Sequence, residues 1–254
     1  MAQKYYVVWQ GRETGIFNDW ATCKQQIDHF PGARYKSFKT RQEAQAAFQG
    51  GASRTSSASG TAGTFKKAPG VKTYSSAEID AIQVDTKIFT DGGCEPNPGK
   101  AGSGIAVYRN GQLAELWYGL YNPNGTNNTA ELNALHQAML MAQQENSHGY
   151  SVVIFCDSKY AIQCITQWAA GWQRKGWKKA GGEIKNLALI QTMFALYETL
   201  KKDISILHVN GHVGVEGNEL ADRMSILAIE EKQTDFVNYQ GELDIETLLA
   251  KRAG

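Results

Sequence analysis

The sequence of 254 residues has few cysteines, no long apolar run and a formal net charge of only +1. Its four cysteines do not pair at the short spacings typical of zinc sites, so we expect reduced thiols and no zinc centre. No apolar stretch reaches the roughly 18 residues that a membrane-spanning helix needs. The first residues also lack the apolar core of a secretory signal. These absences predict a cytoplasmic protein with no membrane partner.

The composition is otherwise that of an ordinary globular protein, with 42% hydrophobic and 20% charged residues. A chain of this length can hold one good-sized domain and a small one, each with its own core. Nothing in it demands oligomerisation, so we expect the larger domain to be monomeric. Because the overall charge is nearly balanced, any polyanion would have to bind to local patches.

The clearest boundary in the chain is the run from Gly50 to Thr64, where every residue except Arg54 is Gly, Ala, Ser or Thr. Such residues are too small and polar to bury a core, so this run predicts a flexible linker. The expected parts are a small domain at 1–48, the linker at 49–81, a large domain at 82–232 and a carboxyl-terminal extension at 233–254.

The small domain combines strand-like runs of β-branched and aromatic residues with two helix-start signals. This combination predicts an α+β domain. The expected elements are strands at 5–9 and 15–17, a helix from Asp19 or Thr22 to Phe30, and a second helix opened by a capping box at Thr40 to Glu43.

The large domain begins with three strands that should pair antiparallel, because the second and third flank the turn Arg109-Asn110-Gly111. Helices and short apolar strands then alternate, which indicates strands added parallel to the same sheet with helices on both faces. The fold class is therefore α/β, with a five-stranded mixed sheet of three antiparallel and two parallel strands flanked by helices. The expected strands are 87–90, 104–108, 113–119, 152–156 and 204–209, and the expected helices are 129–144, 158–168, 183–201 and 217–231.

Two aspartates stand where apolar strands are expected to end. Asp91 follows the strand at 87–90, and Asp157 directly follows the strand at 152–156. In sheets with parallel strands, binding sites form beyond the carboxyl ends of the strands, so both acids are candidates for one cleft. For Asp157 an equally simple interpretation is a helix N-cap, because Asp157 and Ser158 precede an expected helix.

Two further acids lie on or beside the apolar faces of helices. Glu131 shares its face with Leu135 and Ala138, and Asp222 shares its face with Ile226. A carboxylate turned toward a core is unfavourable by several kcal/mol unless a cation or a donor compensates it. The sequence offers no obvious buried Lys or Arg partner, so the four acids suggest a bound metal. The alternative is unpaired acids at helix margins.

The chemistry of the four acids selects the metal. Oxygen-only ligands favour hard cations, and a site that keeps several waters suits Mg²⁺ or Mn²⁺ better than Zn²⁺. Two such ions about 4 Å apart would polarise a scissile phosphate, activate a water and stabilise the leaving oxygen. We therefore expect two Mg²⁺ ions, with Mn²⁺ as a substitute.

Each of these carboxylates belongs to a short motif: Asp91 to Gly99, Thr126 to Leu132, Asp157-Ser158, and Gly211 to Gly214 with Asn218 to Asp222. The four motifs, in this order, resemble those of type 1 ribonuclease H over about residues 82–232. The resemblance implies a ribonuclease H-like fold and an endonuclease that hydrolyses RNA paired to DNA, leaving 3′-hydroxyl and 5′-phosphate ends. It implies Asp91, Glu131, Asp157 and Asp222 as metal ligands, and His212 as a catalytic residue that assists proton transfer or product departure. Without the motif, a lone His would more often be a surface residue.

An enzyme that cuts RNA but not DNA must sense the 2′-hydroxyl, which can both donate and accept a hydrogen bond. The resemblance assigns this contact to residues of the first two motifs, although from the sequence alone they could merely form turns. It also assigns Thr126 and Asn186 to a phosphate of the DNA strand. The expected 2′-hydroxyl contacts are Cys94, Glu95, Asn97, Asn127 and Asn128.

The segment 168–179 interleaves three tryptophans with four cations. Such a stretch can hold phosphates while its rings pack on sugars or bases. The plainer interpretation is a helix with core tryptophans, which we expect for Trp168. The resemblance identifies the segment as a basic protrusion that contacts the DNA strand. The expected contacts are Trp172, Arg174, Lys175 and Trp177.

Residues 4–48 resemble the small hybrid-binding, viroplasmin-like domain attached to many type 1 enzymes. Glu13 and Ser37 stand where relatives often have Lys, which predicts reduced affinity. The residues that carry the resemblance are Gly11 to Phe17, Trp20 and Phe30 to Phe38. By analogy, the expected contacts with the RNA/DNA hybrid are Tyr6, Trp20, Tyr35 and Lys36.

Two other functions fit parts of the sequence. A non-catalytic hybrid-binding protein would keep the fold without its chemistry, but all four acids and His212 are retained. A nuclease or transposase acting on DNA would not need the residues that resemble 2′-hydroxyl contacts. The sequence therefore favours catalysis on RNA/DNA hybrids.

Overall fold

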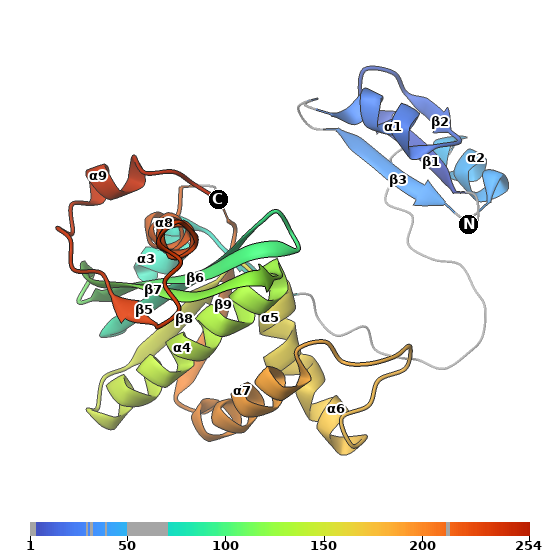
Figure 1. Ribbon diagram of the computed structural model, residues 1–254. Coiled ribbons are helices and arrows are strands. Elements are labelled where there is room, and N and C mark those ends of the chain that lie inside the picture. The colour runs from blue at the N-terminus through green and yellow to red at the C-terminus, as the bar shows by residue number, and fades with distance from the viewer. Residues whose placement is uncertain (1–3, 29, 31–32, 39, 50–70, 212–213) are drawn as a thin grey trace. The chain divides into compact units, whose positions relative to one another are not determined.

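The computed structural model describes residues 4–28, 30, 33–38, 40–49, 71–211 and 214–254, and the chain divides into two compact units, 1–67 and 68–254 (Figure 1). Most of the predicted linker lies outside the described residues. Its last part folds with the second unit, as strand β4 (Thr73–Tyr74) and helix α3 (Ser76–Ala81). The predicted linker boundary at residue 81 is therefore wrong, because a capping box formed by Ser75 and Glu78 begins α3.

The first unit has a three-stranded antiparallel sheet in the order β2-β1-β3 and two helices. Asp19 caps the first helix by accepting a hydrogen bond from the backbone of Thr22, and Thr40 and Glu43 form the predicted capping box of the second. The third strand was not predicted, because its mostly exposed side chains hide the alternation that marks a strand. The elements are β1 (Tyr5–Gln10), β2 (Gly15–Phe17), α1 (Trp20–Ile27), β3 (Arg34–Phe38) and α2 (Arg41–Gln49).

The second unit contains a mixed sheet in the order β10-β7-β6-β5-β8-β9-β4. As predicted, β5, β6 and β7 pair antiparallel, while β8 and β9 extend the sheet in parallel from β5. The sheet has seven strands rather than the predicted five, because β4 pairs with β9 and β10 pairs with β7 at its two edges. The strands not yet given bounds are β5 (Thr86–Glu95), β6 (Gly99–Arg109), β7 (Gln112–Gly125), β8 (Val152–Cys156), β9 (Ile204–Val209) and β10 (Val237–Asn238).

The helices of the second unit follow the predicted order, with one interruption. The helix predicted at 158–168 is divided, because a π-helical turn, η1, follows α5 and leads into α6. The long helix predicted from 183 begins only at Leu187, after Asn186 adopts a left-handed conformation. The helices are α4 (Asn127–Ser147), α5 (Lys159–Gln163), η1 (Cys164–Trp168), α6 (Ala169–Arg174), α7 (Leu187–Leu200), α8 (Glu216–Glu231) and α9 (Ile245–Leu249).

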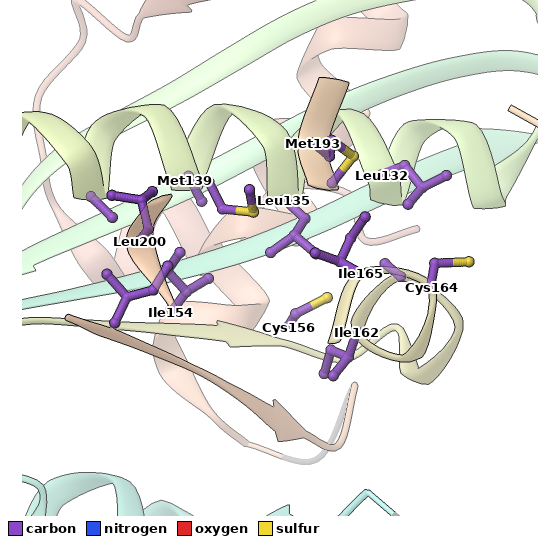
Figure 2. Close-up of a cluster of buried hydrophobic side chains, with 14 of the residues drawn as sticks. Leu132, Leu135, Met139, Ile154, Cys156, Ile162, Cys164, Ile165, Met193 and Leu200 are labelled. Carbon is purple, nitrogen blue, oxygen red and sulfur yellow. The ribbon is translucent and has the colours of Figure 1, made fainter. Parts of the chain in front are cut away.

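Neighbouring residues of the central strands face two separate hydrophobic clusters. Ile88 and Ile154 pack with α4, α5 and α7, whereas Phe89 and Phe155 pack with α3, α8 and α9. Figure 2 shows the first cluster, in which side chains of α4 such as Leu135 lie above those of β8. Helices therefore cover both faces of the sheet. Among the described residues, no helix is both long and apolar enough to span a membrane.

Candidate active site

The four predicted carboxylates line one cleft of the second unit. Asp91 lies in β5, Asp157 follows β8, Glu131 is near the start of α4, and Asp222 lies in α8. Asp91, Glu131 and Asp222 are buried, and Asp157 is half-buried. The N-cap that the sequence also allowed for Asp157 is instead Ser158, whose side chain caps α5.

Parallel pairing of β5 and β8 brings the two aspartates together. The strand β5 does not end before Asp91, as the sequence suggested, because its antiparallel pairing with β6 continues to Glu95. Its parallel pairing with β8, however, ends at Thr90 and Cys156. Asp91 and Asp157 therefore stand immediately beyond the last parallel pair, where sites in such sheets form.

Two glycines let the helices that carry the other acids approach the sheet. A Cβ at Gly92 would lie 2.2 Å from the backbone nitrogen of Glu131, so a side chain there would push α4 away from β5. A Cβ at Gly104 would lie 2.1 Å from the backbone oxygen of Ala221 in α8. The glycines thus allow Glu131 and Asp222 to reach the cleft.

Burial and mutual repulsion both disfavour the ionised acids. Burial and the neighbouring Asp157 and Asp222 raise the pKa of Asp91 well above its ordinary value. Burial, together with Asp91 and Asp157, raises the pKa of Glu131 in the same way. Glu131 Oε1 has one long contact of 3.5 Å with Nδ2 of Asn127, and its Oε2 has no hydrogen-bond partner among the described residues. Glu131 therefore has an oxygen that no described protein group compensates.

Cys156, which was not predicted as a site residue, lies beside these acids. Three possible ligand atoms, one from each of Glu131, Cys156 and Asp157, lie within 4.8 Å of one another. Burial and the carboxylates of Glu131 and Asp157 raise the pKa of the Cys156 thiol well above its ordinary value, so the thiol stays protonated and is a poor ligand. The effective donors are carboxylate oxygens, which suit a hard cation.

Asp222 has donors that the sequence analysis did not predict. Arg223 Nη1 lies 2.5 Å from its Oδ2, and the backbone nitrogen of Gly254 lies 3.1 Å from its Oδ1. The expectation that these acids lack a buried Arg partner is therefore wrong for Asp222. Helical spacing could not reveal this contact, because adjacent residues do not face each other on a helix.

The hydroxyl of Ser225 connects two of the acids. This buried side chain lies 3.0 Å from Oδ2 of Asp91 and 2.9 Å from the backbone oxygen of Asp222. A donor at this place holds the Asp91 carboxylate against α8. The available signal in the sequence was a small polar residue three positions beyond Asp222 on an otherwise apolar face.

The residues assigned to the 2′-hydroxyl lie at the ends of adjacent elements. Cys94 and Glu95 end β5, Asn97 lies in the turn to β6, and Asn127 and Asn128 begin α4. Cys94, Glu95 and Asn127 line the cleft. The backbone nitrogen of Asn127 donates to Oδ1 of Asn97 over 3.2 Å, so the turn role that the sequence allowed is also present.

The two residues assigned to a DNA phosphate are joined through Thr129. The hydroxyl oxygens of Thr126 and Thr129 lie 2.8 Å apart, and the Thr129 hydroxyl donates to Oδ1 of Asn186 over 3.0 Å. Thr126 also caps α4, whose first backbone N–H groups favour an anion. Residues far apart in the sequence therefore form one polar site at the start of α4.

The predicted basic protrusion includes α6 and the turn that follows it. Trp172 and Trp177 are partly buried against the first hydrophobic cluster, whereas Arg174 and Lys175 are exposed. The prediction that Trp168 is a core residue is wrong, because 36% of its surface is exposed. It ends the π-helical turn η1, which changes the periodicity from which its position was predicted.

His212 and Val213 lie outside the described residues, so the catalytic role of His212 stays a prediction. The next described residue, Gly214, is hydrogen-bonded to α8. The backbone nitrogen of Gly214 donates to Oε1 of Glu219 over 2.9 Å.

Three of the four residues predicted to contact the hybrid in the first unit form an aromatic group. The Trp20 ring centroid lies 5.5 Å from that of Tyr6 and 5.8 Å from that of Tyr35. Trp20 and Tyr35 are 44% and 47% exposed, which is unusual for large aromatic side chains. Lys36 follows Tyr35 in β3, so its side chain points to the other face, and its Nζ lies 5.6 Å from the centroid of Phe38.

Known proteins resemble both units. A family model described as RNase H matches residues 83–230, and one described as the Ribonuclease H1 N-terminal domain matches residues 4–48. The chain is 32% identical to Ribonuclease H1 of Mus musculus over 87% of each protein. It is 36% identical to Ribonuclease H of Methylorubrum extorquens over 146 residues, which are 58% of this chain and 60% of that protein.

The fold of the second unit also occurs among solved structures. LC9-RNase H1, a type 1 RNase H with the type 2 active-site motif, matches 65% of this chain and 81% of its own, with a TM-score of 0.52 and 23% identity. That likeness concerns the fold alone, while the family match and the mouse relative extend to the sequence itself. The chain therefore belongs to the ribonuclease H family and joins an amino-terminal domain of the ribonuclease H1 kind to a ribonuclease H domain.

Proposed function

We propose that this protein is an endonuclease that hydrolyses the RNA strand of RNA/DNA hybrids with divalent cations, giving 5′-phosphate and 3′-hydroxyl products. The observation that carries the proposal is the convergence of Asp91, Glu131, Asp157 and Asp222 in one cleft. Membership of the ribonuclease H family supports the reaction class.

The donors in the cleft fit Mg²⁺, or Mn²⁺ in its place. Burial and neighbouring carboxylates raise the pKa of Asp91 and of Glu131, and an adjacent cation would relieve both effects. Oε2 of Glu131 has no partner among the described residues and is available as a ligand. Two bound ions would polarise the scissile phosphate and supply an activated water.

The side chains around the cleft have distinct parts in the proposed reaction. The four carboxylates would hold the cations, and Ser225 orients Asp91 through its 3.0 Å hydrogen bond. We assign to His212 the transfer of a proton to or from the reacting groups, a role that a near-neutral pKa suits.

Selectivity for RNA would come from the rim of the cleft. Cys94, Glu95 and Asn127 line the cleft near the acids, and Asn97 is hydrogen-bonded to the backbone of Asn127. Their carbonyl, amide and carboxylate groups can accept from and donate to a 2′-hydroxyl, which DNA lacks. This arrangement supports action on RNA/DNA hybrids rather than on DNA alone.

The DNA strand would be held away from the cleft. The hydrogen-bonded site of Thr126, Thr129 and Asn186 offers donors for a phosphate at the start of α4. The exposed Arg174 and Lys175 can neutralise further phosphates. In the first unit, the exposed rings of Trp20 and Tyr35 offer stacking surfaces for the hybrid.

Three labelled duplexes test the proposal directly. RNA/DNA, RNA/RNA and DNA/DNA substrates are each incubated with the full chain in MgCl2 or in EDTA, and the product ends are identified. We expect Mg²⁺-dependent cleavage of the RNA/DNA duplex only, with 5′-phosphate ends. Cleavage of the DNA duplex, or cleavage that persists in EDTA, would contradict the proposal.

A further inference from the structure

The carboxyl-terminal extension returns to the cleft that holds the four acids. After β10 the chain forms α9, and Leu248 of this helix is buried in the second hydrophobic cluster. The last residues then leave α9 and run back toward α8 (Figure 1). Arg252, Ala253 and Gly254 line the cleft together with Asp91 and Asp222. The extension is therefore anchored by α9, and its last residues lie in the candidate active site.

The polar contacts of these last residues are made to carboxylates in the cleft and beside it. The backbone nitrogen of Gly254 lies 3.1 Å from Oδ1 and 3.2 Å from Oδ2 of Asp222. Arg252 forms an ion pair with Glu95, which is one of the residues assigned to the 2′-hydroxyl, and its Nη1 lies 3.7 Å from Oε1 of Glu230. The segment thus uses groups that a cation and a substrate would also need.

Arg223 contacts both Asp222 and the end of α9. Its Nη1 lies 2.5 Å from Oδ2 of Asp222, and its Nε donates to the backbone oxygen of Leu249 over 3.3 Å. Both oxygens of Asp222 therefore have protein donors. The Gly254 N–H lies within 3.2 Å of both oxygens and in the cleft, so it competes with a cation for their negative charge and for the space beside them.

We propose that residues 252–254 form an autoinhibitory tail that occupies the cleft and must leave it before a divalent cation and the hybrid bind. The proposal rests on the proposed function, because it assumes that Asp222 is a cation ligand. Repulsion among the buried acids makes the cleft attractive to any donor or cation, and the tail supplies both through Gly254 and Arg252. The tail and the cations thus compete for the same negative charge.

The tail can leave without unfolding the domain. The side chain of Arg252 is 53% exposed, so its ion pairs are solvated and weak. The hydrophobic anchor lies earlier in the chain, at Leu248, and does not depend on the cleft. By linkage, whatever binds only after the tail has left must itself favour the released state. Cations and hybrid therefore release the tail, and its removal makes both bind more tightly.

An alternative role for Arg252 is to bind a phosphate of the substrate at the rim of the cleft. Loss of the tail would then weaken hybrid binding instead of strengthening it. The two roles predict opposite changes in KM, so one set of variants decides between them.

The full chain is compared with a chain that ends at Leu249 and with the point variant Gly254→Val. A Cβ at Gly254 would lie 2.6 Å from Oδ1 of Asp222, so valine displaces the tail without shortening the chain. The matched control is Lys251→Ala, because Lys251 is an adjacent cation that contacts Tyr239 rather than the acids. Thermal unfolding of each variant checks that the domain is folded.

Cation affinity is measured by calorimetric titration of MnCl2 alone, and KM and kcat are measured on an RNA/DNA hybrid. A tail held by a hydrogen bond and solvated ion pairs should weaken apparent cation binding by about threefold to tenfold. We expect truncation and Gly254→Val to lower the Kd for Mn²⁺ and the KM by such factors, while Lys251→Ala changes neither.

Two results overturn the tail proposal while leaving the proposed function intact. One is cation binding that is equal in the full and the shortened chains, and the other is a higher KM after removal of the tail. Absence of Mn²⁺ binding in both chains has a different meaning. It overturns the proposed function, and the tail proposal falls with it.

Discussion

Helix α4 carries two buried glutamates, one near each end, and their surroundings are opposite. Glu145 accepts from Arg109 Nη2 over 2.7 Å and from the Thr86 hydroxyl over 2.9 Å. Burial alone would raise the pKa of Glu145, but the hydrogen bonds from Arg109 and Thr86 hold it below its ordinary value. Among the described residues, Oε1 of Glu131 has a long contact with Asn127 and Oε2 has no hydrogen-bond partner, and burial with its acidic neighbours raises its pKa.

The difference separates a structural acid from a functional one. Burial is common to both side chains, so burial by itself does not identify a site. What distinguishes Glu131 is the lack of a compensating protein group for one of its oxygens among the described residues. An ionised acid left in that state is unfavourable unless something from outside the protein compensates it. The same helix therefore stabilises the fold at one end and forms the candidate site at the other.

The largest expected effect separates the two glutamates by activity. Glu131→Gln keeps the shape of the side chain and removes a charge that holds a cation, so kcat should fall by about 1000-fold, which corresponds to about 4 kcal/mol. Glu145→Gln should leave kcat within about twofold. Steady-state cleavage of an RNA/DNA hybrid in MgCl2 measures both. Equal losses in the two variants would remove the functional distinction between them.

The free energy of unfolding should fall in Glu145→Gln, the variant that keeps its activity, and not in Glu131→Gln. Glu145→Gln leaves Arg109 without one of its two charged partners and should lower the free energy of unfolding by about 2 kcal/mol. Glu131→Gln removes a buried, repelled charge and should raise it by about 1 kcal/mol in EDTA. Denaturant unfolding at pH 7 gives both values. A destabilised Glu131→Gln variant would show that this acid is compensated after all.

The four acids of the candidate site were predicted from the sequence, but no prediction was made for Glu145. The positions of Glu131 and Asp222 on apolar helix faces marked both as unusual, and the alternation of strands and helices placed Asp91 and Asp157 at one edge of the sheet. The capping box of Thr40 and Glu43 was also predicted correctly, because its signal lies within four consecutive residues, whereas the one of Ser75 and Glu78 was not predicted.

Features that depend on contacts between distant residues were missed. The edge strands β4 and β10 are too short to show a period, and they exist through pairing with β9 and β7. The contact of Gly254 with Asp222 joins residues that no helical or strand spacing relates. Trp168 was misplaced because the π-helical turn η1 breaks the period from which its burial was inferred.

The pH dependence of stability should also differ in sign between the two glutamates. The raised pKa of Glu131 means that its protonated form stabilises the folded state below its ordinary pKa of 4.5, and this stability is lost as the pH rises through the raised value. The lowered pKa of Glu145 stabilises the folded state above 4.5, and this is lost as the pH falls through the lowered value. Unfolding in EDTA from pH 3 to pH 8, compared with each Gln variant, measures the two contributions. Parallel curves for the two variants would refute the contrast.

The smallest expected effect comes from a region outside both glutamate sites. Replacing Arg174, Lys175, Lys178 and Lys179 by Glu places negative charge where the DNA strand is proposed to bind, so KM should rise severalfold, and more so at low salt. The change in kcat should be smaller than the change in KM, because none of the four side chains lines the cleft. An unchanged KM would exclude the protrusion from binding.

Cation binding itself tests the central claim most directly. Calorimetric titration of MgCl2 and MnCl2 into the full chain, Glu131→Gln and Glu145→Gln reports binding without depending on cleavage. We expect Glu131→Gln to weaken cation binding by at least about tenfold and Glu145→Gln to bind cations as the unaltered chain does. Equal cation affinity in all three proteins would contradict it.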